Sequence, residues 1–142
     1  MTERVLEELV GTYLAIDRGC LLNSQYIIGE HGKWRAEADF LAVDFPDGEV
    51  WMVEVTKAPY GLRSKIAEFE GEYVHRIREQ LALHHITPKI DKHPDWKIGF
   101  WIFVPKEEKA WVETKLTTTG VINSRVTAIE DMMFPIWKER YR

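Results

Sequence analysis

The chain has 142 residues, 45% hydrophobic and 30% charged, a composition typical of a single globular domain that buries a core. No apolar run approaches the roughly 18 residues of a membrane span, and the charged start is unlike a signal peptide. We therefore expect no membrane partner and a cytoplasmic location. The single Cys20 excludes an internal disulfide and a paired-cysteine zinc site, and is expected to be a small buried residue.

The formal net charge of −4 is unevenly distributed along the chain. Residues 1–60 carry 5 basic and 11 acidic residues, a balance of −6, whereas residues 61–142 carry 14 basic and 12 acidic residues, a balance of +2. This asymmetry favours a cation site in the first part beside a mildly basic second part. It argues against a protein that binds nucleic acid by charge alone.

Hydrophobic periodicity predicts the first elements of one domain spanning residues 1–142. Apolar residues at helical spacing predict an amphipathic helix over 3–17, capped by Thr2. A short strand is expected at 26–28, and residues 33–39 lead into a second strand. A hairpin follows, in which strand 40–45 passes through the turn Pro46-Asp47-Gly48 to strand 49–55.

The second part of the chain continues the alternation of helices and strands. The run 98–104 is apolar on both faces apart from Gly99, which is typical of a central buried strand. The whole order predicts an α/β fold with a mixed central sheet flanked by helices. The other expected elements are a long helix after Ser64 that ends before Pro88, a helix at 106–116, a strand at 125–129 and a terminal helix at 134–142.

Glu54 stands out because apolar β-formers flank it on the predicted strand 49–55. Strand alternation places Val50, Met52, Glu54 and Thr56 on one face. An ionised carboxylate among apolar groups is costly unless it is paired or bound to a metal. Glu54 is therefore the first candidate for chemistry, and the alternative is that it ends an exposed strand face.

Three acids in this order carry a resemblance to a known family. Glu7 in the first helix, Asp39 opening one strand and Glu54-Val55-Thr56-Lys57 closing the next resemble the PD-(D/E)xK nuclease superfamily. The resemblance covers about residues 3–104 and implies the restriction-endonuclease-like αβββαβ core. It implies that Asp39 and Glu54 are the ligands of Mg²⁺ (or Mn²⁺), with Glu7 completing the site through water and Glu8 as the fallback.

The family lysine is the point of departure. It should stand two residues after the glutamate, where this chain has Thr56, and Lys57 comes one residue late. Alternation turns Lys57 away from Glu54 unless a bulge or the strand end turns it back. A Thr56 hydroxyl can orient water but adds no positive charge. Lys65 is an alternative amine, because several branches of the superfamily move this lysine.

The resemblance implies a metal-dependent nuclease that hydrolyses phosphodiester bonds in DNA. We expect a homodimer, because cutting both strands of DNA with so small a domain usually needs two active sites. One alternative is a nuclease-like fold that has lost catalysis and serves as a nucleic-acid-binding or protein-interaction module. Another is an unrelated α/β protein in which the acids are coincidental.

Several other residues carry weaker signals. Arg35 shares a predicted strand face with Glu37 and Asp39, so Arg35 can hold a phosphate and Glu37 can add a ligand, or the face can be a solvated salt-bridging surface. Trp34, beside Arg35, is the tryptophan whose stacking on a base is to be tested. A metal site at His84, His85 and His93 is a weaker alternative, because adjacent histidines point in different directions on a helix.

Overall fold

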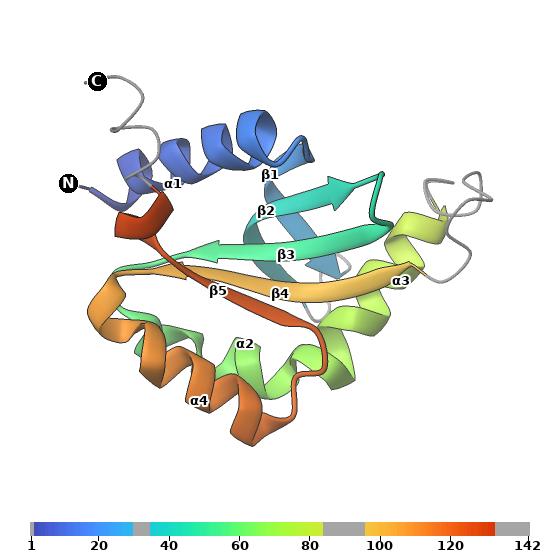
Figure 1. The fold of residues 1–142 in the computed structure, drawn as a ribbon. Coiled ribbons are helices and arrows are strands. Elements are labelled where there is room, and N and C mark those ends of the chain that lie inside the picture. Colours follow the sequence, from blue (N-terminus) through green and yellow to red (C-terminus); the bar gives the residue numbers. More distant parts are fainter. Residues whose placement is uncertain (1, 30–34, 84–95, 133–142) are drawn as a thin grey trace.

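The structure is a computed structural model that describes residues 2–29, 35–83 and 96–132 (Figure 1). Its centre is a five-stranded mixed sheet with the order β1-β2-β3-β4-β5. β1, β2 and β3 pair antiparallel, whereas β3, β4 and β5 pair parallel. The strands are β1 (Leu21–Gly29), β2 (Arg35–Asp44), β3 (Glu49–Val55), β4 (Lys97–Val104) and β5 (Ser124–Ala128).

Helices cover both faces of the sheet (Figure 1). One face carries α1 (Glu3–Thr12), which continues into the wide π-type turn η1 (Tyr13–Asp17). The other face carries η2 (Pro59–Leu62), α2 (Arg63–Glu68), the π-type η3 (Phe69–Tyr73), α3 (Val74–Leu83), η4 (Lys106–Glu108) and α4 (Lys109–Thr119). No helix in the described ranges is long and apolar enough to cross a bilayer.

Two apolar cores hold these layers together. Thr2 caps α1 by accepting a hydrogen bond from the Val5 amide at 3.3 Å, and the buried stripe of α1 and η1 then packs on the sheet beside Trp101. The core on the opposite face is larger and joins the sheet to α2, η3, α3 and α4, with Phe69 and Phe100 stacked at 4.9 Å between ring centroids. The candidate site lies at the end of the sheet where both layers meet β2 and β3.

The predicted mixed α/β architecture is confirmed, and Cys20 is buried as expected. The predicted strand bounds were wrong for the first two strands, because pairing with neighbours extends β1 back to Leu21 and starts β2 at Arg35. The long helix predicted after Ser64 is confirmed, because α2, η3 and α3 follow one another without a gap from Arg63 to Leu83. The wide π-type turn of η3 around Gly71 within it was not anticipated. The expected terminal helix at 134–142 lies outside the described residues.

Gly99 allows β4 to pair closely with β3. A Cβ at position 99 would lie 2.5 Å from Trp51 Cζ3 and 2.8 Å from the Asn123 side-chain nitrogen. Trp51 is buried against Trp101 at 5.4 Å between ring centroids, so it has little room to move. Glycine is thus required at this point by packing.

We expect Gly99→Ala to lower the free energy of unfolding by about 1–3 kcal/mol, because the methyl group overpacks the contact with Trp51. Urea denaturation measures the loss. Gly71→Ala is the matched control, since a Cβ there meets no atom within 4 Å. Equal stability of the two variants would contradict the close approach.

Candidate active site where β2 and β3 diverge

Asp39 and Glu54 lie where the pairing of β2 with β3 ends. The last paired residues are Phe40 and Val53, so both acids stand one step beyond the ladder. Asp39 Oδ2 accepts a hydrogen bond from the Val55 amide at 2.8 Å. The side chain of Asp39 thus satisfies a backbone donor of β3 and holds the two carboxylates together at the opening between the strands.

Lys65 reaches the same point from α2. Glu54 is only 5% exposed, and its Oε1 accepts a hydrogen bond from the Lys65 ammonium. Lys65 Nζ also donates a hydrogen bond to the backbone carbonyl of Glu37 at 2.6 Å. These contacts fix the ammonium between β2 and β3, so the amine that was an alternative in the sequence is the one that touches Glu54.

The environment of Glu54 disfavours its charged form. Burial, followed by the negative charge of Asp39, raises the pKa of Glu54 from 4.5 to about 8. The Lys65 ammonium acts in the opposite direction, and a hydrogen bond with the Asp39 carboxyl group favours the protonated acid. The pair of acids therefore holds a proton at neutral pH unless a cation replaces it.

Tyr73 on η3 is affected by the same acid. Burial and the negative charges of Glu68 and Glu54 raise the pKa of Tyr73 to about 12.

Glu7 joins the acids from α1. Burial, then the charge of Asp39 and a hydrogen bond with its carboxyl group, raises the pKa of Glu7. Gln25 Nε2 donates a hydrogen bond to Glu7 Oε2 at 3.3 Å. Glu8, the fallback in the sequence, is instead exposed, 3.9 Å from Arg4. The structure thus places Glu7 rather than Glu8 beside Asp39.

Gln25 is a residue that sequence reasoning missed. Its φ of 52° is the one positive φ outside glycine among the described residues, and it lies between the pairs Ser24–Phe40 and Tyr26–Ala38, where the β1–β2 ladder skips both Gln25 and Asp39. A left-handed conformation costs roughly 1–2 kcal/mol for a residue with a Cβ. Polar Asn23-Ser24-Gln25 inside a strand was the only available sequence signal, and it does not reveal the sign of φ.

Glu7 also lines a groove between α1 and β1. This groove has a volume of about 580 Å³, and Glu7 and Gln25 form part of its wall. Neither Asp39 nor Glu54 is among its described lining residues. The described lining residues are Arg4, Glu7, Glu8, Gly11, Thr12, Ala15, Ile16, Ser24, Gln25 and Phe40.

Thr56 and the backbone of Lys57 bond to Glu3 at the start of α1. The expectation that Thr56 continues the face of Glu54 was wrong, because β3 ends at Val55. The Thr56 hydroxyl donates to Glu3 Oε1 at 3.3 Å, and the Lys57 amide donates to the same oxygen at 3.3 Å. Glu3 was not anticipated from the sequence, and it draws this turn toward the start of α1.

Arg35 and Glu37 precede Asp39 on β2. Arg35 is exposed at the first position of β2, opposite Gly29. Glu37 is exposed and contributes its carbonyl oxygen to Lys65. Trp34, His84, His85 and His93 lie outside the described residues.

Asp39 and Glu54 fit a divalent cation by their chemistry. Mg²⁺ takes hard oxygen ligands, and it is usually held by one or two carboxylates while retaining several waters. Here two carboxyl groups share a hydrogen bond that needs a proton, and a cation can replace that proton. Within the described ranges no three acidic, histidine or cysteine side chains form a complete metal centre, so water would supply the other ligands.

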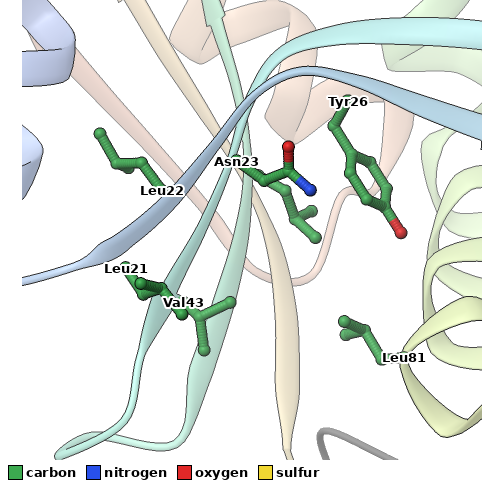
Figure 2. Close-up of a pocket in the computed structure, with 7 residues that line it drawn as sticks. Leu21, Leu22, Asn23, Tyr26, Val43 and Leu81 are labelled. Carbon is green, nitrogen blue, oxygen red and sulfur yellow. The ribbon is translucent and has the colours of Figure 1, made fainter. Parts of the chain in front are cut away.

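A second cavity lies on the α3 side of the sheet, between β1 and α3 (Figure 2). It has a volume of about 490 Å³, and its polar groups are the Asn23 amide and the Tyr26 hydroxyl. The described lining residues are Leu21, Leu22, Asn23, Tyr26, Leu41, Val43 and Leu81. This apolar lining suits hydrolytic chemistry less well than the acid cluster.

Comparison of the chain with protein-family models, curated proteins and solved structures finds no match. The function is therefore inferred from the fold and from the geometry of the site.

The raised pKa of Glu54 gives a pH dependence of stability. Below about pH 4.5 the acid is protonated in both folded and unfolded chains and contributes nothing. Between 4.5 and about 8 the unfolded chain releases a proton that the folded chain retains, so this group lowers stability as pH rises. The groups around it are Asp39 on β2, Lys65 on α2 and Tyr73 on η3.

We expect the Glu54→Gln variant to become more stable than the wild type as pH rises from 4.5 to about 8, because it lacks the group that loses stability on ionisation. The difference in free energy of unfolding should grow by on the order of a few kcal/mol. Lys65 keeps its contact with the Glu37 carbonyl in the variant. Urea denaturation of both proteins at pH 5 and pH 8, without divalent metal, measures the change. Parallel pH profiles would show that Glu54 is not destabilised in its charged form.

Proposed function

We propose that this protein is a metal-dependent nuclease that hydrolyses phosphodiester bonds in DNA, with a restriction-endonuclease-like core. The observation that carries the proposal is the buried Glu54 beside Asp39, with the ammonium of Lys65 fixed against it. An acid pair and an amine at the splayed ends of two adjacent strands match the residue types that this chemistry needs.

The connectivity of the sheet supports the same proposal. An α-helix precedes three antiparallel strands, and a helical segment then leads to β4, parallel to β3. This is the αβββαβ order that the resemblance implies. β5 adds a further parallel strand at the edge.

Each residue has a role that follows from its contacts. Asp39 and Glu54 would hold the cation, with Glu7 acting through water from α1. A bound Mg²⁺ would polarise the phosphate and lower the pKa of a water molecule. Lys65 places a positive charge beside Glu54, where it would favour the hydroxide form of the attacking water and stabilise negative charge on the phosphate.

A catalytically impaired module is the second candidate. Thr56 at the usual lysine position favours it, because its hydroxyl bonds to Glu3. Lys65 supports the enzyme instead, because it supplies the missing charge from α2. In the impaired module the acids would bind metal without cleavage.

We expect the full chain to nick plasmid DNA with Mg²⁺ or Mn²⁺ and to lose this activity in Asp39→Asn and Glu54→Gln. Lys65→Met should slow cleavage by about 10²- to 10³-fold, because it removes a charge that stabilises the reacting groups. Initial rates of nicking under matched conditions measure each effect.

Asp44→Asn is the matched control, because Asp44 is also buried but lies at the opposite end of the β2–β3 hairpin. It should retain cleavage. Undiminished nicking by both Asp39→Asn and Glu54→Gln would refute the proposed site. Absence of nicking by wild type, with metal bound, would favour the impaired module.

A further inference from the structure

Tyr60, Arg63 and Trp111 form an aromatic and cationic cluster on the face of the sheet that α2 and α4 cover. The rings of Tyr60 and Trp111 meet edge to face at 4.8 Å between centroids. The Arg63 guanidinium lies 6.0 Å from the centroid of Tyr60 and 5.7 Å from that of Trp111. Residues from η2, α2 and α4 thus converge where α2 and α4 lie next to each other (Figure 1).

The cluster is open to solvent on the side of Tyr60. Tyr60 is 52% exposed, although an aromatic residue of this size usually buries more of its surface. A Cβ added at the neighbouring Gly61 would meet no atom within 4 Å. Described parts of the protein therefore leave room for a flat ligand against the exposed ring.

The charge of this segment differs from that of the chain. Residues 55–67 contain three basic residues, Lys57, Arg63 and Lys65, and no acidic residue, within a chain of net charge −4. Arg63 begins the same short helix from which Lys65 reaches Glu54. The segment that carries the cluster therefore offers positive charge to the phosphates of a bound nucleic acid.

We infer that Tyr60, Arg63 and Trp111 bind an unpaired nucleobase of single-stranded nucleic acid. Bases of a duplex are stacked on each other, whereas an unpaired base can stack on an aromatic ring or on an arginine plane. The nature of the ligand rests on the proposed nuclease function. The inference narrows that function to substrates with a single-stranded segment or a frayed end.

Binding is measured without cleavage, by fluorescence anisotropy of a labelled 12-nucleotide oligothymidylate in EDTA. We expect Tyr60→Ala to weaken binding by roughly 5- to 150-fold, as for the loss of one stacked base, and Tyr60→Phe to remain close to wild type. Arg63→Gln should weaken it more than Lys97→Gln, which removes an exposed charge at the start of β4. A duplex of the same length should bind more weakly than the single strand.

Thermal melts are the control for folding. We expect the Tyr60 variants to remain folded, because Tyr60 is largely exposed. Equal affinities of wild type and Tyr60→Ala, or equal losses in Arg63→Gln and Lys97→Gln, would overturn the inference. Tyr60-dependent binding without plasmid nicking would support the platform while refuting the nuclease. Nicking with no effect of Tyr60→Ala on binding would leave the nuclease and remove the platform.

Discussion

The Glu54 carboxylate is held in surroundings that oppose its ionisation, and the geometry of the site depends on how this opposition is balanced. Apolar packing excludes water from Glu54, and Asp39 adds a second acid beside it. Only the Lys65 ammonium acts in favour of the charge among the principal influences on this group. A buried acid in such a position is stable with a proton or a metal cation. The choice between a proton and a metal cation therefore connects the buried position of Glu54 with its proposed role in metal binding.

The surrounding elements are arranged around this constraint. β2 pairs with β3 only from Phe40 onward, and Asp39, just before Phe40, bonds to the Val55 amide that the separation exposes. α2 begins soon after β3, which brings Lys65 back over Glu54 and ties it to the Glu37 carbonyl. On the other face, α1 presents Glu7 to Asp39. Strained sites are often functional, and the positive φ of Gln25, which the β1–β2 ladder skips together with Asp39, is consistent with that pattern.

Much of this arrangement is predictable from local patterns. Hairpin chemistry and strand alternation placed Asp39 and Glu54 on adjacent strands, and the apolar neighbours of Glu54 indicated a buried acid that needs a partner. Which lysine would be that partner was not predictable. Lys57 is nearer in sequence, but the position of Lys65 depends on how η2 and α2 pack on the sheet.

Other features were missed because they depend on contacts between distant segments. Thr56 was assigned to the face of Glu54 because alternation was continued past Val55, where the strand ends. Glu3 bonds across the sheet end to Thr56, and no periodicity reveals such a contact. The Tyr60, Arg63 and Trp111 cluster joins two helices that are distant in the chain. Its members are unremarkable singly, and only their packing shows a common surface.

The most direct test is an NMR titration of the Glu54 side-chain carboxyl carbon, with and without Mg²⁺. Without metal, burial and Asp39 should place its pKa near 8. Saturating Mg²⁺ should lower this pKa, because a bound cation favours the carboxylate, and Asp39→Asn should weaken the effect of the metal. Titration near 4.5 without metal, or a pKa that Mg²⁺ leaves unchanged, would contradict a cation site built on Glu54.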